Sequence, residues 1–341
     1  MYNNDDYDFE TYFKNGTKKG KRQILIKPKK KIPLDSETGR IIELYGKKFI
    51  VESLSVPNQK IECTLSGTLS VDNPDSSLVS VGDNVIFTRA TLKDSSEYEG
   101  VILKILERKS LLARRAVGKE PTEHVLASNI DNAIIFMSAA NPFYNRRLID
   151  RIIIASELGG IRPIVCINKI DLIAESEIGK NFSVYNGLGI PVLFMSALTG
   201  KGIVKFRKKI KNCSNVLVGP SGAGKSTLIN KLFGYEVAGT NEISDRTGKG
   251  IHTTSYSQLL KLPNGTEIID TPGIREFGIW GLELNELPLY FHEFDQFHPK
   301  CKFISCSHIH EPGCAVIEAV EAGLLDIDRY ESYLNIYNSL V

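Results

Sequence analysis

The stretch IVCINKID, residues 164–171, decides how the rest of this chain must fold. It predicts a buried strand that ends in Asn168-Lys169-x-Asp171, the pattern of the loop that selects guanine in GTP-binding proteins. The glycine-rich stretch GPSGAGKS, residues 219–226, has the pattern of the loop that binds phosphates. It comes after the first stretch, although it should precede it. Either one of the two matches is accidental, or the domain is circularly permuted.

The context of the phosphate-loop pattern favours a real site. The pattern follows the strand-like NVLV (residues 215–218) and precedes the helix-like LINKLF (residues 228–233), as the motif requires. Glycines let backbone N–H groups converge on phosphate oxygens at a helix N-terminus. Lys225 is expected to neutralise the β- and γ-phosphates, and the Ser226 hydroxyl is expected to hold Mg²⁺.

The guanine base is expected to be read by the loop at the end of the first stretch. Asp171 can accept two hydrogen bonds from the N1–H and the exocyclic amine of guanine, whereas adenine offers no such pair. Asn168 is expected to orient the loop, and Lys169 to stack along the plane of the base. SAL, residues 196–198, ends the next predicted strand, where a second loop can hold guanine through backbone N–H groups.

Two further patterns complete a set of five. DTPG, residues 270–273, ends the last predicted strand, where Asp270 is expected to contact Mg²⁺ through water and the Gly273 N–H to sense the γ-phosphate. RTGKGIHTT, residues 246–254, can order around Mg²⁺ and the γ-phosphate when GTP is bound. The motifs therefore run in the order base, base, phosphate, switch, switch. A circular permutation explains this order, because a sheet keeps its contacts when the old ends are joined and a new break opens in an exposed connection.

Strand-like and helix-like segments alternate after Pro121, which predicts a doubly wound α/β sheet with right-handed crossovers. The expected strands are residues 132–139, 162–168, 190–198, 215–218, 259–263 and 266–270, and the expected helices are residues 146–158, 204–212 and 228–233.

Five short β-rich runs precede this region, between Gly39 and about Arg115. They lie at residues 40–45, 47–55, 60–67, 84–91 and 99–108. Five strands of this length predict a small antiparallel barrel, with the oligonucleotide-binding (OB) fold as the leading candidate. An SH3-like barrel that only packs on its neighbour is the alternative. The closing stretch, residues 108–115, adds positive charge.

The first 34 residues are expected to form a basic flexible arm. Residues 14–31 hold nine Lys or Arg and no acid, and they have too few large apolar side chains to form a core. Lysines at this density favour a role in nucleic-acid binding, and a solvated tail is the alternative.

The overall composition is that of an ordinary globular protein, with 42% hydrophobic and 24% charged residues. No apolar run approaches the ~20 residues that span a membrane, and the N-terminus lacks the apolar segment of a secretory signal. We therefore expect a cytoplasmic protein without a membrane partner, whose six cysteines stay mostly reduced.

With these motifs the chain resembles the bacterial small ribosomal subunit biogenesis GTPases (ribosome small subunit-dependent GTPase A), a circularly permuted class. The resemblance covers about residues 35–341, and it is carried by NKID, SAL, GPSGAGKST, GKGIHTT, DTPGIREF and a cysteine and histidine cluster near the C-terminus. The predicted parts are a basic arm (1–34), an OB-fold barrel (35–118), a permuted P-loop GTPase domain (119–284) and a mostly helical zinc-binding domain (285–341).

The resemblance implies a function and partners. A monomer would bind GTP with Mg²⁺ and bind the small ribosomal subunit and its rRNA late in the assembly of that subunit. It would hydrolyse GTP to GDP and phosphate when the subunit stimulates it, and hydrolysis would drive release. The alternatives are a constitutive rRNA-binding scaffold with a structural nucleotide site, and a P-loop kinase or ATPase. Lys225, Ser226 and Asp270 argue against the scaffold, while NKID and SAL argue against the kinase.

The clustered residues Cys301, Cys306, His308 and Cys314 supply three thiolates and one imidazole, a set that suits tetrahedral Zn²⁺. His310 is a rival for His308, and the family pattern favours His308. No ligand position is left for water, so one structural zinc ion is expected to hold together a region that buries little apolar surface.

The catalytic group is expected to lie in the switch segment. Ras-like proteins have a glutamine directly after the glycine of DxxG, where it orients the attacking water, whereas this chain has Ile274. His252 is the best internal candidate for the missing role, and the resemblance points to the same residue. A structural histidine is the alternative. The residues expected to bind GTP are Asn168, Lys169, Ile170, Asp171, Ser196, Ala197, Leu198, Gly219, Pro220, Ser221, Gly222, Ala223, Gly224, Lys225, Ser226, Thr227, Thr253, Thr254, Asp270 and Gly273.

Overall fold

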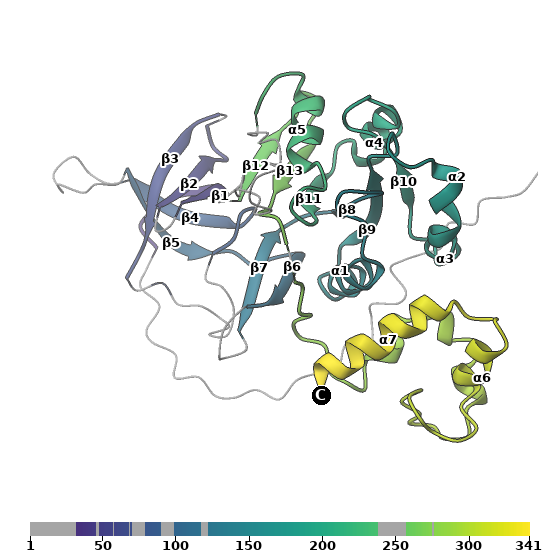
Figure 1. Cartoon of the computed structure of the whole chain (residues 1–341). Coiled ribbons are helices and arrows are strands. Elements are labelled where there is room, and N and C mark those ends of the chain that lie inside the picture. Colours follow the sequence, from purple (N-terminus) through teal and green to yellow (C-terminus); the bar gives the residue numbers. More distant parts are fainter. Residues whose placement is uncertain are drawn as a thin grey trace, which may run out of the picture. The chain divides into compact units, whose positions relative to one another are not determined.

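The structure is a computed structural model of the whole chain (Figure 1). The chain divides into two compact units, Met1–Leu34 and Asp35–Val341, and the helices and strands of the described residues lie in the second. The structure describes residues 32–45, 48–56, 58–67, 69, 79–89, 99–116, 122–237, 257–274 and 276–341. Residues 1–31 of the expected basic arm therefore lie outside the described residues. No helix among those described is long and apolar enough to cross a bilayer.

The N-terminal strands close into a barrel. They are β1 (Glu37–Tyr45), β2 (Lys48–Ser53), β3 (Lys60–Leu65), β4 (Asn84–Arg89) and β5 (Gly100–Ile105). Their order is β1-β2-β3-β5-β4, and β4 pairs back with β1. The β3–β5 pair is parallel and the other pairs are antiparallel. Inward-facing side chains alternate along each strand and fill the interior, so the predicted five-stranded barrel is confirmed.

The second region is a parallel sheet of five strands in the order β10-β9-β8-β11-β13. These strands are β8 (Asn132–Ser138), β9 (Arg162–Asn168), β10 (Val192–Phe194), β11 (Ser214–Val218) and β13 (Glu267–Asp270). Because helices cover both faces, the strand sequences are apolar almost throughout instead of alternating. The predicted doubly wound α/β sheet is confirmed.

Helices cover the two faces of this sheet (Figure 1). Helix α1 (Arg146–Leu158) packs on one face, in the same core as the β8 side chains Ala133, Ile135 and Met137. Helices α4 (Ile203–Ile210) and α5 (Lys225–Phe233) pack on the other face with Ile134 and Phe136. The short helices α2 (Glu175–Ile178), η2 (Gly179–Phe182) and α3 (Ser183–Gly187) connect β9 to β10.

The barrel and the parallel sheet are joined edge to edge. Strand β12 (Gln258–Lys261) forms an antiparallel pair with β13, as expected, and its other edge pairs with β1 through Glu43 and Gln258. The guanidinium of Arg40 bonds to Glu267 at 2.5 Å beside this junction. The pairing covers an edge that would otherwise expose backbone donors and acceptors. The sequence did not predict this continuous eleven-stranded sheet.

A separate hairpin follows the barrel. Strands β6 (Leu111–Arg115) and β7 (Glu123–Ser128) form their own two-stranded sheet, whereas the sequence placed residues 108–115 at the close of the barrel and predicted no strand at 123–128. The Leu111 N–H donates to the Gly159 carbonyl at 3.1 Å. A Cβ on Gly159 would lie 1.7 Å from the Leu111 carbonyl oxygen, so only glycine permits this approach.

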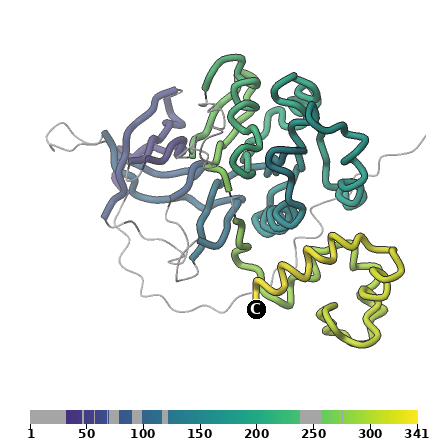
Figure 2. Tube along the Cα trace, in the orientation of Figure 1, coloured from purple at the N-terminus to yellow at the C-terminus, as the bar shows by residue number. Residues whose placement is uncertain are grey.

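After β13 the chain enters a C-terminal region, which the tube in Figure 2 shows in yellow-green to yellow. Its elements are η3 (Leu287–Tyr290), η4 (His292–Phe294), η5 (His298–Lys300), α6 (Ala315–Glu321) and α7 (Ile327–Leu340). They share one apolar core, which includes Phe291, Phe294 and Tyr333.

Buried charges join α7 to α1. The guanidinium of Arg329 bonds to Asp150 at 2.6 Å and to Glu293 at 2.6 Å, and it lies over the ring of Phe291. Asp150 also accepts a hydrogen bond from the Tyr185 hydroxyl at 2.8 Å. Burial by itself would lower the pKa of Arg329, but the two carboxylates outweigh it and raise that pKa. The charges are thus compensated within the protein.

Candidate functional site

Four of the five predicted nucleotide motifs meet at one edge of the parallel sheet. Asn168 ends β9 and Asp270 ends β13, while Gly219 follows β11 directly and Ser196 lies two residues beyond β10. The carboxyl ends of parallel strands are where ligands bind in open α/β sheets. The structure therefore brings together loops that lie up to about a hundred residues apart in the sequence.

Three glycines shape the phosphate loop. A Cβ on Gly219 would lie 1.9 Å from the Phe136 carbonyl oxygen, and a Cβ on Gly224 would lie 2.4 Å from Nδ2 of Asn168. Gly222 and Gly224 also adopt positive φ angles of 79° and 97°. Such angles and approaches are open to glycine and costly for other residues. The loop conformation accordingly requires the glycines of the motif.

Lys225 begins helix α5 and is held inside the loop. Its Nζ donates to the carbonyl oxygens of Gly219 at 2.8 Å and Pro220 at 3.1 Å. Burial lowers the pKa of this ammonium to about 8, and the nearby Asp270 carboxylate opposes the shift. A phosphate anion would favour the charged form. Ser226 and Thr227 follow in the first turn of α5, where both are partly exposed.

The side-chain amide of Asn168 links three loops. Its Nδ2 donates to the Ala223 carbonyl at 2.9 Å, and its Oδ1 accepts a hydrogen bond from the Ala197 N–H at 2.8 Å. The side chain is buried. Since Ala223 belongs to the phosphate loop and Ala197 to the loop after β10, one residue fixes both against the end of β9.

The residues after Asn168 present a carboxylate to solvent. Lys169 adopts a positive φ of 63°, and its Nζ donates to the Asn141 carbonyl. Burial lowers the pKa of Lys169, while Asp171 opposes this shift. Ile170 is buried and its N–H donates to the Met195 carbonyl at 3.3 Å. Asp171 is exposed, so its carboxylate can accept hydrogen bonds from a ligand.

The loop after β10 is also held by its own backbone. The Ser196 N–H donates to the Lys201 carbonyl at 2.9 Å, and the Ser196 carbonyl accepts from the Gly200 N–H at 2.8 Å. Leu198 is 73% exposed beside them. The Ala197 N–H, one of the backbone donors expected to meet guanine, donates instead to Asn168.

The DTPG loop packs directly on the phosphate loop. Asp270 is fully buried at the end of β13. A Cβ on Gly273 would lie 2.9 Å from the Ser221 backbone nitrogen, and the Ile274 N–H donates to the Gly219 carbonyl at 3.1 Å. A conformational change in either loop would therefore displace atoms of the other.

The predicted switch residues cannot be placed in this arrangement. His252, Thr253 and Thr254 lie outside the described residues, and their roles remain predictions. One contributor that the sequence analysis missed is Asn141, which accepts the hydrogen bond from Lys169. Its position three residues after the end of a buried strand was the available signal, because such loops also reach the ligand-binding edge.

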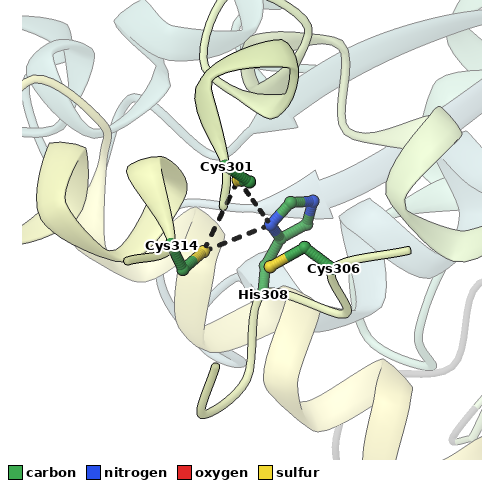
Figure 3. A group of neighbouring side chains, drawn as sticks. All are labelled: Cys301, Cys306, His308 and Cys314. Atoms are coloured by element: carbon green, nitrogen blue, oxygen red, sulfur yellow. Dashed lines mark hydrogen bonds between the residues drawn. The ribbon is translucent and has the colours of Figure 1, made fainter. Parts of the chain in front are cut away.

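The second candidate site is the cysteine and histidine cluster. The donor atoms of Cys301, Cys306, His308 and Cys314 all lie within 4.8 Å of one another (Figure 3). The Sγ atoms of Cys301 and Cys314 are 3.9 Å apart, and Nδ1 of His308 lies 3.7 Å and 3.3 Å from them. Thiolates around a tetrahedral zinc ion are roughly 3.8 Å apart for Zn–S bonds of about 2.3 Å. The four side chains could therefore hold one metal ion.

The protonation preferences of the cluster fit this interpretation. Burial lowers the pKa of His308 to about 4, with a contribution from His298, so the imidazole is neutral and offers a lone pair. Burial and neighbouring thiols raise the pKa of Cys306 to about 12. A thiolate at this position needs a compensating cation, which a divalent metal supplies.

Residues around the cluster orient its ligands. Nε2 of His308 lies 2.9 Å from Nδ1 of His298, which leaves Nδ1 of His308 directed at the thiols. The Glu311 carboxylate accepts hydrogen bonds from the backbone N–H groups of Ser307 at 2.7 Å and Ile309 at 3.1 Å. The Tyr330 hydroxyl donates to the His308 carbonyl at 2.8 Å. Such outer contacts typically fix the tautomer and ring orientation of a ligating histidine.

Comparison with known proteins places both sites in a familiar context. A family model described as RsgA GTPase matches residues 105–280. A Chlorobaculum parvum protein named Small ribosomal subunit biogenesis GTPase RsgA is 42% identical over 308 residues, covering 89% of this chain and 98% of that protein. A protein of the same name from Haemophilus influenzae is 35% identical over 311 residues, covering 90% and 86% of the two chains.

Solved structures agree. The crystal structure of YjeQ from Thermotoga maritima matches with a TM-score of 0.65 and 30% identity, covering 89% of this chain and 98% of that one. YloQ, described as a circularly permuted GTPase, matches with a TM-score of 0.61 and 25% identity, covering 89% and 95% of the two chains. The circular permutation predicted from the order of the motifs is thereby confirmed.

The geometry of the loops yields a prediction for Asn168→Ala. The change removes two buried hydrogen bonds and leaves the Ala223 carbonyl and the Ala197 N–H without this partner. We expect a loss of unfolding free energy of about 2–4 kcal/mol, because each unsatisfied buried group costs ~1–3 kcal/mol. Urea denaturation of the nucleotide-free protein measures it. Asn186→Ala, at an exposed position, is the control; equal stability of the two variants would contradict the linking role of Asn168.

Proposed function

The chain belongs to the RsgA GTPase family, and from this premise we propose that it hydrolyses GTP on the small ribosomal subunit, late in the assembly of that subunit. The observation that supports this most strongly is the 42% identity to a small ribosomal subunit biogenesis GTPase over nearly the whole of both chains. The protein acts in the cytoplasm as a monomer. Hydrolysis to GDP and phosphate drives its release from the subunit.

We assign guanine selection to Asp171 and the loops that Asn168 holds together. The exposed Asp171 carboxylate accepts hydrogen bonds from the N1–H and the exocyclic amine of guanine, and the stem of Lys169 packs along the base. The Lys169–Asn141 hydrogen bond keeps that stem in place. Adenine lacks the donor pair, so it binds more weakly.

The phosphates lie along residues 219–227 and the N-terminus of α5. Backbone N–H groups of the loop and the Lys225 ammonium neutralise the phosphate charge. Ser226 and Asp270 are the residues that would hold Mg²⁺, and the metal would neutralise the negative charge of the phosphates. Gly273 lies against the phosphate loop, and we assign to its N–H the role of sensing the γ-phosphate.

The step that the subunit stimulates requires a group that orients water. Ile274 occupies the position directly after Gly273, is buried and offers no side-chain hydrogen bond. We assign the role to His252, which the bound subunit presses towards the attacking water. This assignment places the trigger in the segment between the phosphate loop and β12.

The test of the proposed function is GTP cleavage with and without purified small subunits. We expect the subunits to accelerate single-turnover cleavage of GTP, and the wild-type chain to co-sediment with them better with a non-hydrolysable GTP analogue than with GDP. A chain that binds equally in both nucleotide states, without stimulated cleavage, would be a constitutive scaffold. Lys225→Ala, which removes the phosphate countercharge, serves as the background control.

The assignment of His252 predicts a specific defect in His252→Ala. GTP affinity should stay near the wild-type value, because the proposed role of the side chain is to orient water and not to bind the ground-state phosphates. Subunit-stimulated cleavage should fall by a factor on the order of 10² or more, the usual scale for a positioned polar group. Residence on the subunit should lengthen accordingly. If stimulated cleavage proceeds at the wild-type rate, the catalytic group comes from the ribosome or from a bound ion.

We propose that the cluster of Cys301, Cys306, His308 and Cys314 holds a structural Zn²⁺. Three thiolates and one imidazole fill a tetrahedral coordination sphere and leave no position for water. Support comes from the separations of the donor atoms and from the neutral, oriented imidazole of His308. The ligands lie on the turns that precede α6 and at the residue that caps its N-terminus, so the metal ties these turns to the start of α6.

Metal analysis of the purified protein should find about one zinc per chain. Cys306→Ser should lower this content and the thermal stability of the C-terminal region, while Cys213→Ser, a cysteine outside the cluster, should leave both unchanged. Absence of zinc from wild-type protein prepared without chelator would refute the assignment.

A further inference from the structure

The middle of the chain has an unusual charge imbalance. Residues 178–235 contain nine Lys or Arg and not a single Asp or Glu. One of the nine is Lys225 of the phosphate loop. Most of the others lie on or beside helix α4 and belong to none of the nucleotide motifs, so the nucleotide site does not account for them.

Helix α4 exposes its charges on one side. Ile203, Phe206 and Ile210 are buried against the sheet, and the lysines point the opposite way, as the helical repeat requires. Lys231 on α5 lies close by, since a Cβ on Gly200 would be 3.5 Å from its Cε. The α4 basic face comprises the exposed residues Lys201, Lys205, Lys208, Lys209, Lys211 and Lys231.

Arg207 belongs to the same helix but has a structural role. Its guanidinium donates to the carbonyl oxygens of Lys231 at 3.2 Å and Leu232 at 2.5 Å, at the C-terminal end of α5. A cation at this position satisfies the carbonyl groups at the helix end and interacts favourably with the helix dipole. It also fixes α5 beside α4, which holds the exposed lysines in one surface.

No acidic side chain neutralises this face within the described part of the chain. None of its six ammonium groups forms an ion pair or a side-chain hydrogen bond with a described residue. Lys205 and Lys209 lie four residues apart on α4, where a pair of like charges destabilises a helix by about 0.2–0.5 kcal/mol. The arrangement therefore costs stability in the isolated protein, and an anionic partner would remove the cost.

We propose that the α4 basic face binds the phosphate backbone of small-subunit rRNA. The inference rests on the proposed function and adds a contact that the GTPase domain itself makes with the subunit. Lysines act as point charges that suit phosphates, and they need no base-specific geometry. A protein partner would require buried apolar or aromatic anchors, whereas Val204 is the one exposed apolar residue of α4.

The face lies next to the nucleotide loops without taking part in them. The Lys201 carbonyl accepts a hydrogen bond from the Ser196 N–H, so the loop after β10 continues directly into α4. Lys205, Lys208 and Lys209 lie one to two turns further along. Their replacement therefore leaves the nucleotide site and the basal GTP cleavage unchanged.

The test compares two triple variants of the full-length chain bound to a non-hydrolysable GTP analogue. In Lys205→Gln/Lys208→Gln/Lys209→Gln, affinity for small subunits should fall on the order of tenfold or more at moderate salt. The dependence of log K on log salt should become less steep by about 2–3, since each phosphate contact contributes ~0.7–0.9. Lys205→Arg/Lys208→Arg/Lys209→Arg keeps the charge and should bind nearly as the wild type does.

The outcomes separate this proposal from the proposed function. If the wild type binds subunits and the glutamine variant has the same affinity and salt dependence, the α4 proposal is overturned while the function stands. If the wild type does not bind subunits at all, both are overturned. Repeating the measurement with protein-free small-subunit rRNA identifies the partner. A defect seen with subunits but not with this RNA would assign the face to an acidic protein and reject the RNA contact.

Discussion

The nucleotide site depends on the two hydrogen bonds of the Asn168 side-chain amide. The amide hydrogen bonds to Ala223 and Ala197, which follow two other strands and lie 55 and 29 residues further along the chain. Because the amide acts between spatial neighbours, it does not matter which loop comes first in the sequence. The parallel strand order supplies the neighbours, and the amide fixes their loops in register. Circular permutation can therefore change the order of the motifs and preserve the site.

A second constraint follows from where the permutation places the chain ends. Strand β13 now leads into the C-terminal region, and α7 returns to pack against α1, where Arg329 meets Asp150. Removing one partner of such a buried pair typically costs ~3–5 kcal/mol, because the other charge is left uncompensated. Helix α1 starts five residues after Asn141 and ends beside Gly159 of the hairpin contact. Helix α1 thus connects the loops that follow β8 and β9 to the region that contains the cysteine and histidine cluster.

The phosphate loop and the cysteine and histidine cluster were predictable from the sequence because the geometry of each is local. The residues 219–227 lie in one turn between a strand and a helix, and Cys301–Cys314 spans a short segment. The contacts that assemble the regions were not predictable. Glu43 pairs with Gln258, which lies more than two hundred residues further along the chain. The neighbouring sequence of Arg329 predicts an exposed arginine, although the side chain is buried. Only the folded chain shows that its charge is buried and matched.

Basic side chains have different partners on the two helices that cover opposite faces of the parallel sheet, α1 and α4. On α1, Arg146 bonds to Asp326 and Asp328, and Arg147 bonds to Glu331, so these cations hold α7 in place. On α4, the described acids provide no counterpart for the lysines. Net charge of +2 for the whole chain conceals this division, because the arginines of one face are already neutralised. Burial and pairing, more than the number of basic residues, decide which cations are available to a polyanion. By this criterion the lysines of α4, unlike the paired arginines of α1, are available to the RNA phosphates that we propose as their partner.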